Sequence, residues 1–425
     1  MLILLVVLLI LIGAGVPIAY SLGLSAAVFF FFADPQLLEV LPQRLFSGMN
    51  SYALIALPFF ILMGLLMNAS GITNRLIEFS TLFVGRLRGG LGLVNVLASM
   101  LFGGISGSSA SDTASIGSVL IPEMKARGYP ARFAAGITVA SSTMGMIIPP
   151  SIPMVLYGVV AQQSIGKLFL GGVVPGVLVG VLQVAIALGI ARRQNYPRED
   201  ASPSLRQALG RTLRSLPVLL MPVIVVGAVV FGVATATESA ALSVAYAAAV
   251  GFLVLRQLTA AAFLSCLKSA IGTSARIMII IALSQVYIWV LALERTPEAI
   301  ANVVTGLGLG PLGMLLVVDL IILIAGTVID VSPAILLLTP VFLPALGEAG
   351  VSPIHFGVIL VSGLAVGACT PPVGNCLNVC AAVSKLSIGS IFRGAAPFLV
   401  ANITAFLLIT LFPELVLWLP SALMD

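Results

Sequence analysis

Charged side chains are scarce in this sequence, and hydrophobic ones dominate it. Only 8% of the 425 residues are Asp, Glu, Lys or Arg, whereas 60% are hydrophobic. Soluble domains usually contain about 25% charged residues, so the composition excludes a water-soluble globular protein. The formal net charge of +5 is too small for a phosphate-binding face, so we expect no nucleic-acid partner.

Histidine, cysteine and phosphate-binding motifs are equally sparse. His355 is the only histidine, and the four cysteines lack the clustering of a structural zinc site. A Ser–His pair and a histidine-rich transition-metal site are therefore excluded. No G-x-x-x-x-G-K-[ST] motif occurs, so the chain has no recognisable ATP-hydrolysing loop. We predict a protein that is not an enzyme and has no cofactor, because a catalytic acid–base pair is also missing.

Long apolar runs are abundant, and a membrane helix needs only about 20 apolar residues. Hydropathy predicts membrane spans over 3–33, 51–69, 130–163, 168–191, 216–232, 236–256, 277–294, 354–385 and 394–419. The first of these is interpreted as a retained span, because no Lys or Arg precedes Arg44 as a signal peptide would require. We therefore predict an all-α polytopic membrane protein in which residues 1–425 form a single integral membrane unit.

The apolar stretch 89–124 differs from an ordinary span. Arg88 precedes it and Arg127 follows it, so both ends are predicted to be cytoplasmic. Its middle is the polar run Ser106-Gly-Ser-Ser-Ala-Ser-Asp112. This pattern predicts a re-entrant helical hairpin, whose non-helical tip must be buried or line a cavity. The alternative is two full spans joined by a Ser-rich external loop, but two crossings need about 40 apolar residues.

Proline and glycine positions recur at a separation of 222 residues. The matched positions are Pro122 and Pro344, Gly128 and Gly350, Gly145 and Gly367, Pro149-Pro150 and Pro371-Pro372, and Pro175 and Pro397. The same offset maps the first hairpin onto 311–346, whose centre is Val328-Ile-Asp330-Val-Ser332-Pro-Ala334. We predict repeat 1 over about 1–191 and repeat 2 over about 215–425. The Arg-rich segment 192–214 between them is predicted to be a cytoplasmic linker.

Flanking charge indicates that the two repeats are inverted. Lys125 and Arg127 follow the first hairpin, whereas the segment after the second contains Glu348 and no Lys or Arg. One segment should therefore face the cytoplasm and the other the outside, which places the N-terminus inside and the C-terminus outside. Inverted repeats with broken helices near the bilayer midplane are typical of secondary transporters.

A second break follows each hairpin. Tandem prolines interrupt the spans 130–163 and 354–385, and a helix must unwind there because proline donates no backbone hydrogen bond. Unwound carbonyls coordinate hard cations, and half-helix N-termini attract anions. We predict two symmetry-related cation sites with an anionic substrate between them. Kinks that serve packing alone are the alternative.

The coupling ion is predicted from the acidic residues that lie at membrane depth. Asp112, Asp330, Glu238 and Asp319 are the acidic residues at apparent membrane depth, and they do not form the paired carboxylates of a proton relay. Asp112 and Asp330 lie where the returning half-helices begin. This position is at least as compatible with a role as helix N-cap as with coordination of the ion. The pattern favours sodium over proton coupling.

The motifs together resemble the large membrane subunit of TRAP transporters, the DctM/SiaM type within the ion-transporter superfamily. They are the first hairpin's Ser-rich tip, Leu57-Pro-Phe-Phe-Ile-Leu-Met-Gly64, Ile147-Ile-Pro-Pro-Ser-Ile-Pro153, Gly232-Val-Ala-Thr-Ala-Thr-Glu-Ser-Ala240 and Thr370-Pro-Pro-Val-Gly-Asn375. The resemblance implies a multi-pass protein of the bacterial inner membrane that imports an organic acid with Na⁺ by an elevator mechanism. It also implies a small four-helix membrane subunit (DctQ/SiaQ type) and a periplasmic substrate-binding protein (DctP/SiaP type).

The resemblance also assigns site residues. The first sodium site would involve Gly104, Ser106, Ser108, Ser109, Gly145, Met146 and Pro149, and the second Gly326, Thr327, Gly367, Thr370 and Pro371. Substrate, such as sialic acid or a C4-dicarboxylate, would contact Ser108, Ser109, Ser151, Thr370 and Asn375. Neither tip contains Arg or Lys, so dipoles and hydroxyls must bind a carboxylate unless a distant cation approaches. The rival functions are a standalone sodium-coupled dicarboxylate transporter and, in another class, a channel.

Overall fold

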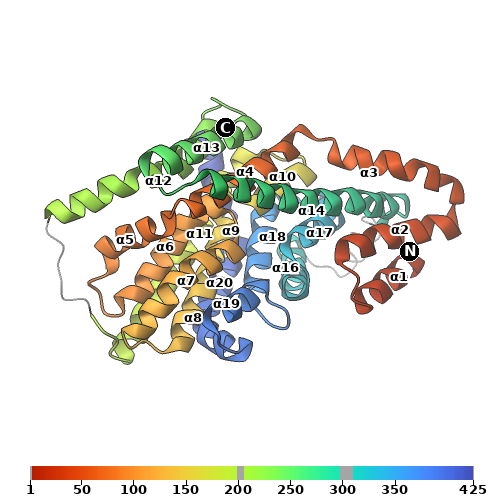
Figure 1. Cartoon of the computed structure of the whole chain (residues 1–425). Helices are drawn as coiled ribbons and strands as arrows, with labels where there is room; N and C mark the ends of the chain where they lie inside the picture. The colour runs from red at the N-terminus through yellow and green to blue at the C-terminus, as the bar shows by residue number, and fades with distance from the viewer. Residues whose placement is uncertain (1, 199–204, 297–309, 425) are drawn as a thin grey trace.

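The computed structural model describes residues 2–198, 205–296 and 310–424, and within these ranges every regular element is a helix. Eight of the described helices are long and apolar enough to cross a membrane, and a ninth span results if one bent pair is counted as a single crossing. The fold class expected from composition, an all-α polytopic membrane protein, is therefore confirmed. Figure 1 shows the helices and the two chain ends.

The N-terminal helices form an arm at one side of the molecule (Figure 1). The arm consists of α1 (Leu2–Gly13), α2 (Ile18–Ala33) and α3 (Leu41–Met49), with α2 and α3 packed against the long helix α14 (Ala260–Leu293). The predicted single span 3–33 is wrong, because the chain breaks between α1 and α2. Gly15 has a φ of 81° and Pro17 is extended with a ψ of 138°, so the first helix ends and a second begins after a turn.

A second group of helices connects the arm to the rest of the molecule. Its members are α4 (Ala56–Ala69), α5 (Ile72–Val84), α12 (Leu205–Val230), α13 (Ala236–Ala249, continued by a π-turn over Val250–Val254) and α14. α4 packs against α13 and α14, and α12 packs against α5 and α13. The predicted span 277–294 is too short, because α14 begins at Ala260 after the N-cap Thr259, whose hydroxyl accepts from the Ala262 N–H at 3.2 Å.

The remaining helices form the two repeats. In repeat 1 the hairpin is α6 (Gly90–Ser106) and α7 (Ser109–Ala126), and the broken helix is α8 (Ala131–Ser141), α9 (Met144–Ile147) and α10 (Ile152–Val160), followed by α11 (Ile165–Arg193). In repeat 2 the hairpin is α16 (Pro311–Val328) and α17 (Val331–Glu348), and the broken helix is α18 (Pro353–Gly367) and α19 (Asn375–Ser384), followed by α20 (Ile388–Leu411) and α21 (Glu414–Met424). Both hairpins and both breaks thus lie where the sequence predicted them. The predicted last span 394–419 is divided between α20 and α21 at Phe412-Pro413.

The helix boundaries reproduce the offset of 222. Helix α7 runs over 109–126 and α17 over 331–348, so both ends of the two helices are 222 residues apart. Helices α11 and α20 begin at residues 165 and 388, one residue out of step. At the C-terminal ends the cause is shared, because Gly128 and Gly350 follow α7 and α17 at the same offset and have φ values of 84° and 83°.

The two repeats pack against one another reciprocally. Helix α7 contacts α19 and α17 contacts α10, while α8 contacts α20 and α18 contacts α11. In each of these two pairs, a helix of repeat 1 and its equivalent in repeat 2 contact equivalent helices of the opposite repeat. Such reciprocal packing is what a two-fold relation between the copies produces, and it supports the inverted repeat.

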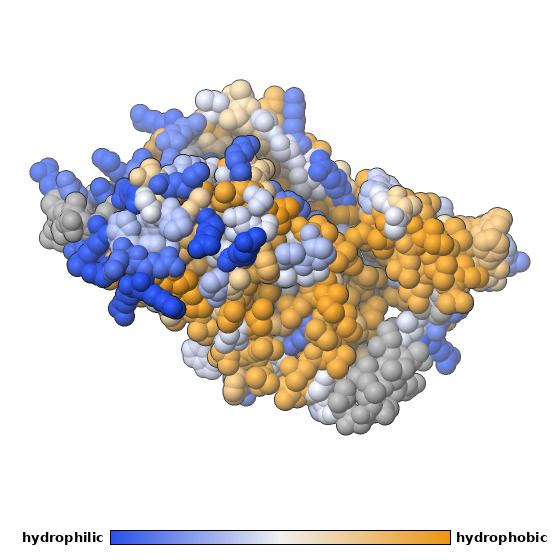
Figure 2. Space-filling model, turned by 90° about the horizontal axis from the view of Figure 1, so that it is seen from below, coloured by the Kyte–Doolittle hydropathy of each residue, from blue (hydrophilic) through white to orange (hydrophobic). Residues whose placement is uncertain are grey.

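Polar side chains are unevenly distributed on the surface. Figure 2 shows hydrophilic residues gathered at one end and apolar surface over the middle of the same face. The arginines that follow α11 and precede α12 belong to the charged end, at the left of Figure 1. Apolar side chains on the outer faces of helices that cross a bilayer contact lipid, so this surface fits a membrane-embedded middle.

Candidate functional site

The tip of the first hairpin is built by Gly107 and Ser108. Gly107 has a φ of 60°, a left-handed conformation that ends α6, and Ser108 is the extended N-cap of α7, accepting from the Ser111 N–H at 3.5 Å. Asp112 lies one turn further on and is fully buried. An N-cap role for Asp112 is therefore wrong, because Ser108 occupies that position.

The tip of the second hairpin is built differently. Here α16 ends at Val328, Ile329 is extended, and Asp330 is the N-cap of α17. Its carboxylate accepts from the Val331 N–H at 2.9 Å. The predicted N-cap role is therefore confirmed for Asp330.

In the first break, a serine side chain replaces the hydrogen bonds that proline cannot make. Pro150 lacks the N–H that would donate to the Met146 carbonyl four residues earlier. The Ser151 hydroxyl donates to that carbonyl instead and also accepts from the Met154 N–H at 3.3 Å, capping α10. The Pro149–Pro150 peptide bond is cis, as is Pro371–Pro372 in the second copy.

The first hairpin tip touches the first break through backbone atoms. A Cβ on Gly145 would lie 3.3 Å from the Ser108 carbonyl oxygen, and one on Gly104 would lie 3.1 Å from the Pro149 carbonyl oxygen. These glycines therefore allow a carbonyl of the tip to approach the break at Gly145, and a carbonyl of the break to approach the hairpin at Gly104. The structure thus brings together the residues predicted for the first sodium site.

The second tip and break meet even more closely. A Cβ on Gly367 would lie 2.5 Å from the Gly326 carbonyl carbon. The Thr327 carbonyl accepts from the Val373 N–H at 3.1 Å and from the Gly374 N–H at 3.4 Å, which fastens the loop after the Pro–Pro pair to the end of α16. The structure thus brings together Gly326, Thr327 and Gly367, three of the residues predicted for the second sodium site.

A cavity of about 410 Å³ lies where the two tips and two breaks converge. From the repeats it is lined by Ser106 to Ser111, Met146, Ile152, Pro153, Asp330, Val331, Ser332, Ala368 and Asn375. We call it the central cavity. Of the predicted substrate contacts, Ser108, Ser109 and Asn375 line it. Ser151 and Thr370 do not: the Ser151 hydroxyl is engaged by the break, and the Thr370 hydroxyl donates to the Val366 carbonyl at 2.9 Å.

The opposite wall of the central cavity comes from α4 and α14 and contains a cation. Ser269, Thr273, Arg276, Ile277 and Ile280 lie along one face of α14, at spacings of three and four residues. Arg276 is the one Lys or Arg among the described lining residues, and Asp330 is the one carboxylate. Sequence analysis missed Arg276 because the residue lies just before the predicted span 277–294. Arg276 could have been identified from the sequence because it lies within a long apolar stretch. A charged side chain at membrane depth is a functional candidate.

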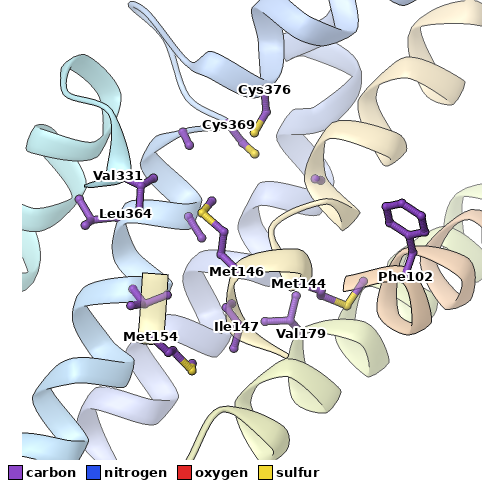
Figure 3. Packing of buried hydrophobic residues seen from close by; sticks show 14 of the residues in the cluster. Phe102, Met144, Met146, Ile147, Met154, Val179, Val331, Leu364, Cys369 and Cys376 are labelled. Carbon is purple, nitrogen blue, oxygen red and sulfur yellow. The ribbon is translucent and has the colours of Figure 1, made fainter. Parts of the chain in front are cut away.

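Several buried side chains next to the breaks carry sulfur, among them Met144, Met146, Cys369 and Cys376 (Figure 3). Met146 lies between the two repeats in this view, with Cys369 and Cys376 close by. The Cys376 thiol donates to the Ser109 hydroxyl at 3.1 Å, and the Cys369 thiol donates to the Val139 carbonyl at 3.2 Å. Both thiols are buried. Cys369 and Cys376 pack within the buried hydrophobic cluster, and no cluster of metal-ligating side chains occurs among the described residues.

Comparisons with known proteins agree with this architecture. Residues 5–415 match the family described as "Tripartite ATP-independent periplasmic transporter, DctM component". The "C4-dicarboxylate TRAP transporter large permease protein DctM" of Pseudomonas aeruginosa is 40% identical over 403 residues, covering 94% of each chain. The "Sialic acid TRAP transporter large permease protein SiaM" of Vibrio cholerae is 35% identical and covers 96% of this chain and 95% of the relative.

Among solved structures, the YdaH transporter of Alcanivorax borkumensis has a similar fold, with a TM-score of 0.65, 14% sequence identity and 90% of each chain covered. That likeness concerns the fold alone. The family match over nearly the whole length, together with the paired tips and breaks, identifies the chain as a member of the TRAP transporter large permease family, a multi-pass membrane transport protein.

Proposed function

We propose that this chain is the large membrane subunit of a sodium-coupled, binding-protein-dependent importer of a small organic acid in the bacterial inner membrane. The observation that carries the proposal is the central cavity, where both hairpin tips, both helix breaks and Arg276 converge on about 410 Å³. A transport site should lie at the interface of the repeats and be reachable by parts that move relative to one another. The central cavity lies at the interface of the repeats and is closed on its other side by α4 and α14, which supports the proposal.

The substrate's charge follows from the cavity lining. Arg276 offers a planar fork of N–H donors suited to a carboxylate, and the hydroxyls of Ser108, Ser109 and Thr273 offer further hydrogen bonds. The names of the two relatives specify a C4-dicarboxylate and sialic acid. Both are carboxylates, and a small carboxylate is therefore the proposed substrate class.

Sodium coupling is supported by the chemistry of the two tip-and-break contacts. Hard cations are held by oxygen ligands, including backbone carbonyls. The glycines at 104, 145, 326 and 367 bring the backbone of tip and break within contact distance. Asp330 is the one carboxylate among the described residues that line the central cavity, so the lining does not supply the carboxylate chain expected of a proton relay. We therefore assign Na⁺ as the transported coupling ion.

Movement is proposed to occur between two groups of helices. The hairpins and broken helices contact one another across the repeats and form the first group, while the arm and the helices α4, α5, α12, α13 and α14 form the second. The central cavity lies at the boundary between the two groups. An elevator movement of the first group against the second would carry ligands held at the tips past the wall formed by α14.

The proposed partners are a small four-helix membrane subunit, which would extend the second group of helices, and a periplasmic binding protein, which would deliver the acid. Lipid covers the remaining apolar surface. Exposed side chains on α12 such as Leu209, Leu213, Leu220 and Val223 give that helix a wide apolar face, which requires either lipid or a membrane-embedded protein against it.

The test is uptake into proteoliposomes that contain both membrane subunits, with the binding protein loaded in turn with succinate, sialic acid and other candidate acids. An imposed Na⁺ gradient should drive uptake of at least one acid. Replacement of Na⁺ by K⁺, with a proton gradient retained, should stop it. Persistent uptake in K⁺ would refute sodium coupling, and uptake that ignores the binding protein would point to a standalone transporter.

A further inference from the structure

A second cavity lies beside the arm, and no role in the transport cycle has so far been given to it. It has a volume of about 590 Å³ and lies between α3, α14, the end of α10 and α17. The lining residues are Arg44, Ser47, Gly48, Asn50, Ser51, Leu54, Val159, Val160, Gln162, Ile281, Gln285, Ile288, Trp289, Ala292 and Pro340. We call it the arm cavity.

The arm cavity adjoins the central cavity along α14. Ser269, Thr273, Arg276, Ile277 and Ile280 line the central cavity, and Ile281, Gln285, Ile288, Trp289 and Ala292 line the arm cavity. The two linings are continuous in sequence at Ile280 and Ile281, and the second is turned by roughly a third of a turn about the helix axis relative to the first. From 269 to 292 they follow the helix over about 35 Å at 1.5 Å per residue, enough to cross the apolar part of a bilayer.

The charge of the arm cavity has one sign. Arg44 carries the one formal charge among the described lining residues, and six other lining residues are polar: Ser47, Asn50, Ser51, Gln162, Gln285 and the indole-bearing Trp289. The guanidinium carbon of Arg44 lies 4.8 Å from the centre of the Trp289 ring. This contact orients the guanidinium without neutralising it, and no carboxylate pairs with Arg44 within the described part of the chain.

The sequence assigns this cavity to the outside of the membrane. Gln162 follows the first broken helix and Ala292 is near the end of α14. The topology predicted from flanking charge places both points on the external side, and Arg44 lines the same cavity. The central cavity, lined by the earlier part of α14, lies nearer the middle of the helix.

We propose that the arm cavity is a binding site for small carboxylates, which receives the substrate anion on the external side before it reaches Arg276 in the central cavity. This inference rests on the proposed function, because it takes the transported substrate to be an organic acid. Arg44 supplies attraction and the amide and hydroxyl groups supply exchangeable hydrogen bonds. A single exposed guanidinium also binds weakly enough to release the anion onward.

The first experiment measures the local potential without relying on transport. In the purified complex of the full chain with its small subunit, with Cys266 replaced by serine, Ser47→Cys is labelled with methanethiosulfonates bearing one negative or one positive charge. A unit charge about 7 Å away in water contributes about RT, so each labelling rate should change about 2.7-fold, in opposite directions. The preference for the negative reagent should fall about sevenfold in Arg44→Gln and persist in Arg44→Lys.

The second experiment asks whether the substrate occupies the cavity. The acid that the uptake screen identifies, or succinate and sialic acid if none is found, should slow labelling of Ser47→Cys when Arg44 is present and not in Arg44→Gln. Uptake by Arg44→Gln should fall about fivefold at limiting substrate and recover at saturating substrate, whereas the control variant Gln43→Ala, at an exposed position of α3 outside the cavity lining, should behave like the parent. Arg276→Gln should instead lose uptake at all concentrations.

The outcomes separate the two proposals. Absence of sodium-driven uptake in the parent protein would refute the proposed function, while labelling and its protection would still decide the arm cavity. The carboxylate site would be overturned if the acid does not slow labelling of Ser47→Cys. It would also be overturned if uptake by Arg44→Gln is unchanged at limiting substrate. If Arg44→Gln weakens binding of the empty binding protein by the same factor, the cavity contacts that protein and the proposal is wrong.

Discussion

Adding one methyl group at Gly367 tests the second tip-and-break contact directly. A Cβ there would lie 2.5 Å from the carbonyl carbon of Gly326 and 2.6 Å from its Cα. Carbon atoms in van der Waals contact are about 3.5–4.0 Å apart. Helices α16 and α18 must therefore separate by about 1 Å in Gly367→Ala, and overpacking of this kind costs about 1–3 kcal/mol.

The same displacement should weaken sodium activation if the carbonyls at this contact hold the ion. If about 1.4 kcal/mol of the cost falls on the sodium-bound state, the Na⁺ concentration for half-maximal uptake rises about tenfold. Initial uptake rates in proteoliposomes at varied external Na⁺ measure this change, and thermal unfolding of the purified complex measures the loss of stability. We expect both to change together in Gly367→Ala.

Two matched variants make the result interpretable. A Cβ on Gly145, the equivalent position in repeat 1, would meet the Ser108 carbonyl oxygen at 3.3 Å, which requires a shift of only a few tenths of an ångström, so Gly145→Ala should be milder. A Cβ on Gly347 in α17 meets nothing within 4 Å, so Gly347→Ala should resemble the parent. The reasoning is refuted if Gly367→Ala and Gly347→Ala have the same sodium dependence and stability.

Three further predictions concern charge, topology and the buried polar groups. Arg276→Gln should lower uptake at least tenfold and Arg276→Lys less, since lysine keeps the charge without the planar fork; equal uptake by both variants and the parent would exclude a substrate contact. Cysteines at Glu123 and Glu348 should react with impermeant reagents from opposite sides of the membrane, and reaction from one side would contradict the inverted repeat. The buried Asn402 donates to the Ala140 carbonyl at 3.1 Å and accepts from Gln183 at 2.6 Å, so Asn402→Leu should cost about 1–3 kcal/mol of unfolding free energy; an unchanged thermal midpoint would show that these groups find other partners.

Sequence reasoning worked best where a backbone requirement leaves a residue signature. A helix cannot continue through Pro149-Pro150 or Pro371-Pro372, and the tips require a glycine or an N-capping residue, as at Gly107 and Asp330. These constraints are local, so hairpins and breaks were located to within a few residues. The offset of 222 then related two distant parts of the chain without any knowledge of their packing.

The features that sequence reasoning missed depend on tertiary contacts or on a short break inside an apolar run. Hydropathy treats residues 3–33 as continuous, because the turn at Gly15 and Pro17 is flanked by apolar helices on both sides. Arg276 was treated as the flank of a span, because hydropathy alone cannot tell a helix end from a cation that faces a cavity. Its neighbours in the central cavity come from α4 and from both repeats, and no local pattern contains that information.

The reciprocal contacts of α7 with α19 and of α8 with α20 have a consequence for biogenesis. When the ribosome has completed the first repeat, the surfaces of α7 and α8 that pack on the second repeat still lack their partners. They remain exposed in the membrane until α19 and α20 emerge near the end of synthesis. A chain truncated before α19 should therefore be a substrate for membrane quality-control proteases, even though its first hairpin and first broken helix are complete.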